Sequence, residues 1–227
     1  MLKKLYQQEY KGGHIMSMRI YTMTHKKFTP LPDPLYVPLH VGRACGENLE
    51  YLGDDTGEQI SALNCYYSEL TGFYWIWKNC HDADYVGTCH YRRYLINEKE
   101  QIYTEKEYLE LLRKYDLVTT KKVLLNNSYY DGFLANHNIR ALEMTGKVIT
   151  EKYPEYADAF EQLVNGRQTY FGNILVTSKI LFDEYASWLF SIFFEVAERI
   201  ELETGEDAYH KRVFGFISEF LLLVWVT

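Results

Sequence analysis

The order of apolar and polar residues along this chain predicts strands that alternate with helices. Short segments rich in β-branched and aromatic residues predict four strands, at residues 19–24, 84–89, 116–120 and 170–177. Apolar residues spaced three and four apart predict helices, at residues 61–77, 104–114, 138–152, 154–164, 178–204 and 209–227. The proline-rich stretch 29–38 and the stretch 50–60, with its paired glycines, are predicted to be loops.

Strands that alternate with helices are typical of the α/β class, in which helices cover both faces of a mainly parallel sheet. We expect a single domain over residues 18–227. Residues 1–17 are polar and lack the apolar run of a secretory signal, so they are expected to form a flexible leader.

Composition narrows the classes of function. The 227 residues carry a net charge of −7, which argues against a nucleic-acid partner. Four scattered cysteines predict reduced thiols in a cytoplasmic protein. The longest apolar runs are too short to cross a bilayer. The aromatic face of residues 185–194 offers peripheral attachment to the inner face of a membrane, but a buried core helix is the favoured interpretation.

Basic residues follow the predicted strands, at the point where each strand ends. Thr24 leads into His25, Lys26 and Lys27, and the second strand leads into His90, Arg92 and Arg93. The third strand leads into Lys121 and Lys122. Ligands of open α/β sheets bind beyond the carboxyl ends of the strands, so these cations predict a phosphate site. The alternative, strongest for the lysines, is that they are solvated surface charges.

The motifs of several phosphate-binding and hydrolytic classes are absent. The sequence contains no GxxxxGK[ST] loop, no GxGxxG after the first strand, no GxSxG elbow and no HExxH pair. What remains is an α/β protein that binds a phosphate-bearing ligand mainly with side chains, as nucleotide-sugar transferases do. Asp82 and Asp84 match the metal-binding DxD of many such enzymes, but they precede their strand, which favours a simple turn at the opposite edge. No metal ligand is therefore assigned, although a divalent ion (Mn²⁺ or Mg²⁺) stays open as a cofactor.

Acidic residues supply further candidates. Asp54 and Asp55 lie in the glycine-flanked loop, where they would bind a ribose, a uracil or a metal, or simply form a solvated turn. Glu219 interrupts the apolar run 214–226, and such surroundings can tune a carboxylate as a general base. An ion pair with Arg212 or a surface position is the alternative for Glu219.

Two polar residues complete the candidate site. His137 precedes a predicted helix and is a candidate for contacting the acceptor or acting as the base, with a role in capping the helix as the alternative. Asn173 lies in the middle of the predicted fourth strand, where it would face the sugar or be a hydrogen-bonded core amide.

Several motifs resemble those of a known family. They are Ile20-Tyr21 with Thr24-His25-Lys26, Tyr51-Leu52 with Asp54-Asp55-Thr56-Gly57, Glu69-Leu70-Thr71 with Tyr74-Trp75-Ile76-Trp77-Lys78, Asp84-Tyr85-Val86-Gly87 with Cys89-His90-Tyr91-Arg92-Arg93-Tyr94, and Arg212-Val213-Phe214-Gly215-Phe216 with Ser218-Glu219. From Arg19 to Trp225 the chain resembles bacterial glycosyltransferases of capsular and exopolysaccharide clusters, catalogued as domain of unknown function 4422. It departs at Phe220, where the family usually has Arg, and it stops soon after Glu219.

The resemblance implies a GT-A-like (Rossmann-like) fold and an inverting hexosyltransferase. The implied donor is a nucleotide-diphosphate sugar such as a UDP-sugar, with UDP-galactofuranose as one candidate. The implied acceptor is a glycan or lipid-linked glycan in polysaccharide biosynthesis. We expect His90 and Arg92 to stabilise the departing diphosphate in place of a DxD-bound metal. The alternative is a noncatalytic nucleotide- or glycan-binding protein of a polysaccharide-assembly complex.

Overall fold

The computed structural model describes residues 16–202 and 208–227. Nearly all of the expected leader, residues 1–17, lies outside the described residues. Within them, six strands form one sheet in the order β3-β2-β1-β4-β8-β5. The strands of this sheet are β1 (Met18–Thr24), β2 (Tyr36–His40), β3 (Leu52–Gly53), β4 (Tyr85–His90), β5 (Leu117–Thr119) and β8 (Leu175–Ser178).

The first four of these strands are parallel, whereas β8 runs antiparallel to both of its neighbours, β4 and β5. The carboxyl ends of β1, β2, β4 and β5 therefore lie at one edge of the sheet. A separate pair, β6 (Val123–Leu124) and β7 (Gln168–Thr169), lies outside this sheet. The mainly parallel sheet confirms the predicted α/β class.

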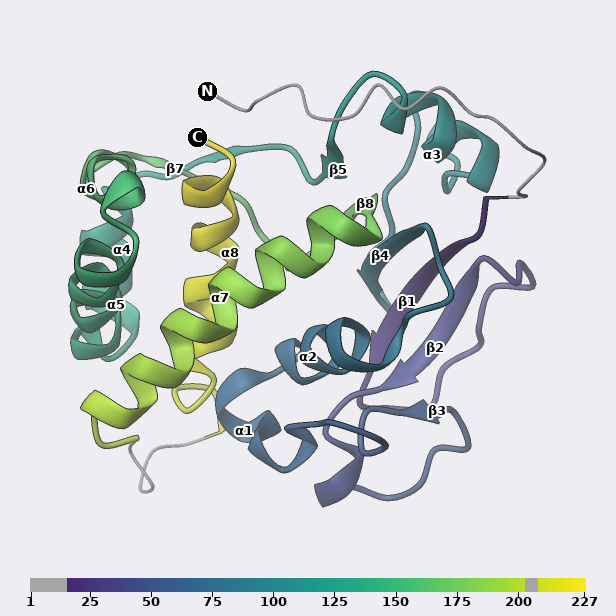
Figure 1. Ribbon diagram of the computed structural model, residues 1–227, viewed down its shortest axis with the longest axis horizontal. Helices are drawn as coiled ribbons and strands as arrows, with labels where there is room; N and C mark the ends of the chain where they lie inside the picture. The colour runs from purple at the N-terminus through teal and green to yellow at the C-terminus, as the bar shows by residue number, and fades with distance from the viewer. Residues whose placement is uncertain (1–15, 203–207) are drawn as a thin grey trace.

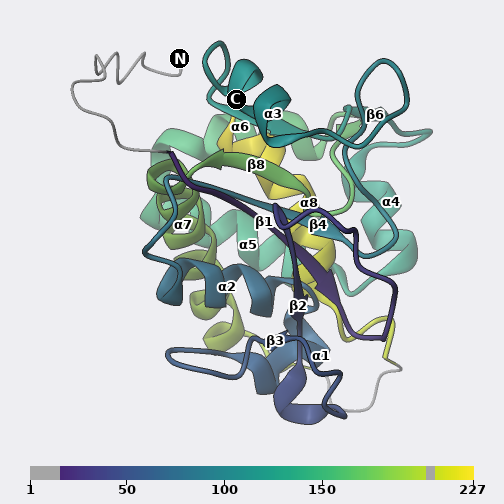
Figure 2. The same ribbon diagram turned by 90° about the vertical axis from the view of Figure 1, so that its right-hand side faces the viewer.

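Helices cover both faces of the sheet, as Figures 1 and 2 show. The helices are α1 (Asn64–Tyr67), α2 (Leu70–Asn79), α3 (Glu105–Leu112), α4 (Tyr129–Asn136), α5 (Ile139–Lys152), α6 (Ala157–Val164), α7 (Lys179–Arg199) and α8 (Val213–Trp225). Short 3₁₀ helices occupy Arg43–Cys45, Ser61–Leu63 and Pro154–Tyr156.

The alternation of side chains along the strands explains this layering. In β1, Tyr21 faces the larger core with α2, α5, α7 and α8, whereas its neighbour Ile20 faces a smaller core that includes Tyr108 of α3. Thr104 begins α3 with the predicted capping box, and Ser178 caps the long helix α7 through the Leu181 N–H. The sequence predicted these two helix starts correctly.

The prediction of a loop over residues 29–38 is wrong at its end, because Tyr36–His40 form β2. Pro38 lies inside this strand, opposite Thr22 of β1. The next strand, β3, pairs only with Leu39 and His40, so no ladder on that side depends on an N–H from Pro38. Proline content alone therefore overstated the length of the loop.

Positive backbone φ angles interrupt two other predicted elements. The single helix predicted from Ser61 is broken at Ser68, where φ is 52°, so α1 and α2 are separate. The fourth predicted strand, 170–177, shrinks to β8 because Gly172 (φ 99°) and Asn173 (φ 47°) form a turn before it. The sequence pattern also missed α4.

The aromatic face of residues 185–194 is not available to a membrane. Tyr185, Trp188 and Phe190 are all buried, because α7 packs between the sheet and the other helices of the larger core. The structure therefore supports the buried-helix interpretation of this face. No helix in the described part of the chain is both long and apolar enough to cross a membrane.

Candidate functional site

A cleft of about 340 Å³ opens at the carboxyl edge of the sheet. The ends of β1 and β4, the turn before β8, the α1–α2 junction and the start of α8 form its walls. It brings together six of the residues predicted from sequence, namely Thr24, His25, His90, Arg92, Arg93 and Glu219. Residues from distant parts of the chain thus converge on the position where α/β proteins bind their ligands.

A larger hollow, of about 800 Å³, lies between α5 and α6. Its charged lining is mainly acidic, with Glu143, Glu151, Asp158 and Glu161 against Lys147. None of the predicted site residues lines it. The smaller cleft is therefore the better candidate for a phosphate-bearing ligand, because, of these two hollows, it is the one lined by cations from several elements.

His90 and the two arginines after it form the centre of the basic wall. His90 Nδ1 accepts the Arg92 N–H at 3.3 Å, and the Arg92 guanidinium lies 5.0 Å from the ring of Tyr91. Burial, together with the charges of Arg92, Arg93 and His25, lowers the pKa of His90 to about 4. A neutral His90 can still donate one hydrogen bond, while the arginines carry the positive charge.

Neither Arg92 nor Arg93 forms a salt bridge within residues 16–202 and 208–227. Both are largely exposed at the mouth of the cleft. Two guanidinium groups that form no salt bridge in this part of the chain attract an anion and match the geometry of phosphate oxygens.

A third arginine, Arg212, faces the cleft from the residue that precedes α8. Its guanidinium lies 5.2 Å from the ring of Tyr209 and 5.6 Å from that of Phe216. Its Nε is buried and has no hydrogen-bond partner in the described residues. The sequence analysis named Arg212 in a family motif and as a possible partner for Glu219, but not as a site residue, and no salt bridge joins Arg212 and Glu219 in this part of the chain. Their spacing of seven residues, about two helical turns, was the signal that both face the same side.

The end of β1 contributes Thr24 and His25. The Thr24 hydroxyl accepts the Lys26 N–H at 3.1 Å and donates to the Lys26 carbonyl, which fixes the turn after the strand. Burial lowers the pKa of the His25 imidazole, helped by the nearby charges of Lys26, Arg92 and Arg212. Thr24 therefore shapes the cleft wall, and His25 faces the same positive field as His90.

The lysines after the strands do not reach the cleft. Lys26 is exposed and does not line it, and Lys27 forms a surface ion pair with Glu50 at 2.8 Å. Lys121 and Lys122 are exposed and lie outside the cleft lining. These positions fit the alternative of solvated surface charges.

Glu219 of α8 supplies a carboxylate to the cleft wall. Its Oε1 accepts the Gly172 N–H at 2.7 Å. Burial raises the pKa of Glu219 to about 7, and the negative charge of Glu69 adds to this rise, while the Gly172 hydrogen bond and Arg93 oppose it. A carboxylate that is partly ionised near neutral pH suits a general base.

Asp54 and Asp55 hold the chain together outside the cleft. Asp54 is fully buried, and its carboxylate accepts the N–H groups of Gly42 and Arg43 and the hydroxyl of Ser61. Asp55 lies 3.4 Å from the guanidinium of Arg43. Neither residue lines the cleft, and the contacts that both carboxylates make are with residues of the neighbouring loop.

His137 and Asn173 lie behind the cleft wall. The His137 ring stacks on Phe216 at 4.2 Å between centroids, and burial, with the charges of His210 and Arg212, lowers the pKa of His137 to about 4. Asn173 is buried, and its amide is fully hydrogen-bonded, as the alternative of a core amide requires. Neither side chain lines the cleft.

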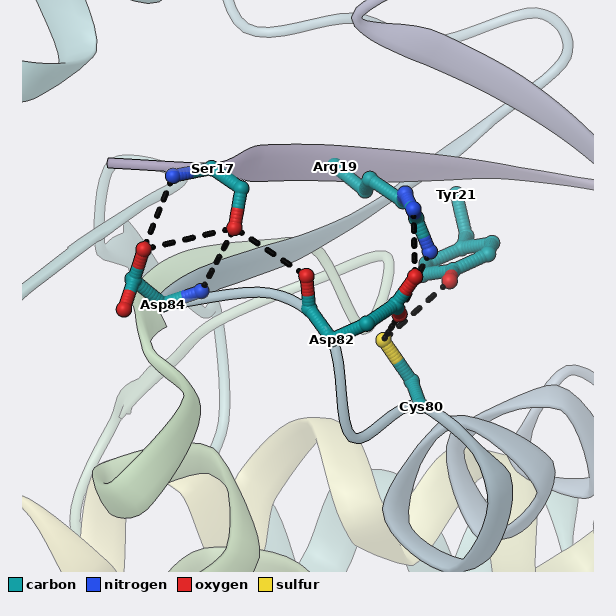
Figure 3. Close-up of polar contacts among 6 residues, drawn as sticks. All are labelled: Ser17, Arg19, Tyr21, Cys80, Asp82 and Asp84. Atoms are coloured by element: carbon teal, nitrogen blue, oxygen red, sulfur yellow. Dashed lines mark hydrogen bonds and ion pairs between the residues drawn. The ribbon is translucent and has the colours of Figure 1, made fainter. Parts of the chain in front are cut away.

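The DxD sequence does not fit a metal site. Asp82 and Asp84 lie in the connection between α2 and β4, at the amino end of the sheet (Figure 3). Asp82 forms two hydrogen bonds with Arg19, at 2.7 and 2.6 Å, and Asp84 accepts the Ser17 N–H at 2.8 Å. These carboxylates close the connection onto β1. Across the described residues, no group of three or more His, Cys, Asp or Glu side chains is arranged to hold a metal ion.

Comparison with known families agrees with the sequence motifs. A family described as domain of unknown function (DUF4422) matches residues 19–227. The chain belongs to this family. Its structure is also similar to one described as the apo structure of WbbM, a bifunctional glycosyltransferase, with a TM-score of 0.84 and 32% sequence identity.

The match to WbbM covers 92% of this chain and 42% of the WbbM chain, so this family member corresponds to less than half of that protein. No curated protein matches the chain. The comparison confirms the fold class and relates this family member to a glycosyltransferase.

Proposed function

We propose that this family member transfers a sugar from a nucleotide-diphosphate donor to a hydroxyl group of a glycan acceptor. One observation carries the proposal: His25, His90, Arg92, Arg93 and Arg212 surround a single cleft in a chain whose net charge is −7. The three guanidinium groups supply the positive charge and the two imidazoles add hydrogen-bonding groups, and such a cluster in an acidic protein favours a strongly anionic ligand. A diphosphate satisfies several of these donors at once.

The magnitude of these interactions is sufficient for a donor site. Hydrogen bonds to charged groups contribute about 1.5–3 kcal/mol each, so two or three of them, with a packed nucleoside, give an affinity on the order of micromolar. Aromatic rings beside the cations offer a surface for the nucleoside. Between ring centroids, Phe28 lies 5.5 Å from Tyr51 and 5.8 Å from Tyr91. The Tyr91 ring in turn lies 5.7 Å from the ring of His25. We propose a UDP-sugar as the donor.

In the proposed reaction, Glu219 takes the proton of the acceptor hydroxyl. The acceptor oxygen forms a bond to the anomeric carbon while the bond from that carbon to the diphosphate oxygen breaks. The electron pair of the broken bond leaves with the nucleoside diphosphate, where the arginines stabilise the added negative charge. A single displacement of this kind inverts the configuration at the anomeric carbon.

The arginines and His90 would stabilise the leaving diphosphate, which is the role of a DxD-bound metal in other transferases. The proposal therefore predicts activity that does not depend on an added divalent ion. Loss of activity in a chelator, with recovery in Mn²⁺, would contradict this part of the mechanism if Arg92→Ala were also fully active.

The test is the release of nucleoside diphosphate from a panel of UDP- and GDP-sugars, with and without a glycan acceptor. We expect release from a UDP-sugar by the wild type, and a loss of at least tenfold in Arg92→Ala. Arg113→Ala is the matched control, because Arg113 is exposed and ends α3, just before β5 begins at the opposite edge of the sheet. Nucleotide binding without turnover would favour the noncatalytic alternative.

A further inference from the structure

A two-residue turn holds both carboxylates that line the cleft. Gly172 and Asn173 adopt left-handed conformations, with φ of 99° and 47°, immediately before β8. The Gly172 N–H donates to Glu219 Oε1 at 2.7 Å, and the Asn173 Nδ2 donates to Glu69 Oε1 at 2.8 Å. Neighbouring residues of one turn thus bind two acidic side chains from distant parts of the chain, one just before α2 and one within α8.

The orientation of the Asn173 amide is fixed on every side. Its Nδ2 also donates to the Gly215 carbonyl at 2.9 Å, and its Oδ1 accepts the Ser218 hydroxyl at 2.8 Å. A reversed amide would place Oδ1 against a carboxylate and a carbonyl, both of which only accept hydrogen bonds. The buried position therefore requires donors toward Glu69, which Asn supplies and Asp does not.

The sequence analysis named Glu69 only as part of a family motif and gave it no role in the site. It precedes α2, next to the left-handed Ser68, and it lines the same cleft as Glu219. Two carboxylates that share a cleft repel each other when both are ionised, so the proton is retained to higher pH. Glu69 is anchored from behind by Asn173, and this contact fixes it in the wall that it shares with Glu219.

We propose that Asn173 is a positioning residue of the transfer reaction, which holds Glu69 in the cleft so that the charge of Glu69 keeps Glu219 reactive as a base. The inference rests on the proposed function, because it concerns the base of that reaction. Neither Asn173 nor the turn needs to touch the substrate. The other groups that face Glu219 are the Gly172 N–H and Arg93, with Tyr129 of α4 behind it.

Two substitutions test separately the charge of Glu69 and its attachment to Asn173. Glu69→Gln removes the charge but keeps an oxygen that accepts from Asn173, so the acidic limb of the kcat/KM profile should move to lower pH. Asn173→Asp removes the amide donors and leaves an acidic group against the Glu69 carboxylate and the Gly215 carbonyl, so Glu69 is no longer held in the cleft wall and kcat should fall. Glu110→Gln, on the exposed side of α3, is the control that should leave the profile unchanged.

A ¹³C NMR titration of the glutamate carboxyl groups, in the wild type and in Glu69→Gln, measures the same coupling without turnover. The Glu219 resonance should titrate at lower pH in the variant. If the wild type releases no nucleotide from any donor, the proposed function fails while this titration still reports the coupling. If the wild type is active but neither the titration nor the acidic limb moves in Glu69→Gln, the inference about Asn173 and Glu69 is overturned.

Discussion

Replacing Glu219 with glutamine is expected to stabilise the protein at alkaline pH while it removes the proposed base. Burial and Glu69 raise the pKa of Glu219 from its ordinary value of 4.5 to about 7. The ionised side chain is therefore unfavourable in the folded protein. The amide of Gln keeps an oxygen that can accept the Gly172 N–H but carries no charge.

The sign follows from proton binding in the two states. Between pH 4.5 and 7 the folded wild type keeps a proton that the unfolded chain has lost, so the free energy of unfolding falls as the pH rises. Above pH 7 Glu219 is ionised in the folded protein, and the full free-energy cost of that charge, at most about 3 kcal/mol, lowers the free energy of unfolding. Solvent in the cleft screens part of it, so we expect Glu219→Gln to gain about 1–3 kcal/mol near pH 8.

Urea unfolding of the wild type and Glu219→Gln, at about pH 4.5 and about pH 8, measures the difference. We expect the two to be nearly equal at the lower pH and to diverge at the higher one, with Glu110→Gln following the wild type at both. Equal stability of Glu219→Gln and the wild type at both pH values would refute the raised pKa and, with it, the reason to assign Glu219 as the base.

Three further substitutions test the structural roles. Phe220 is fully buried and stacks on Tyr129 at 4.2 Å, so Phe220→Ala should lower the free energy of unfolding by about 3–5 kcal/mol, as measured by urea unfolding. Asp82→Asn breaks an exposed ion pair with Arg19 and should lower the free energy of unfolding by less than about 1 kcal/mol. It should also leave the response of donor turnover to added Mn²⁺ unchanged. Ser178→Ala removes the N-cap of α7 and should lower the free energy of unfolding by about 1 kcal/mol.

Part of the site could be predicted because it depends on local sequence. His90, Arg92 and Arg93 follow a short apolar strand, and a parallel sheet brings strand ends to one edge. The same reasoning placed Asp82 and Asp84 at the opposite edge, where the structure has them.

Other features depend on contacts between distant segments, which a single sequence does not reveal. Glu69 enters the cleft because the chain turns at Ser68, and Asn173 meets Glu69 across 104 residues of sequence. Asp54 has the sequence context of a ligand, yet the N–H groups of Gly42 and Arg43 bind its carboxylate. The periodicity of apolar residues predicts which face of a helix is buried but not which polar residue lies opposite.

The central claim is that the cations of the cleft bind a diphosphate. Calorimetric titration of UDP and of uridine into the wild type, Arg92→Ala and Arg113→Ala tests it most directly. We expect UDP to bind with an affinity on the order of micromolar, uridine to bind far more weakly, and Arg92→Ala alone to weaken UDP binding by about tenfold or more. Equal binding of UDP and uridine, or equal UDP affinity in all three proteins, would contradict the account.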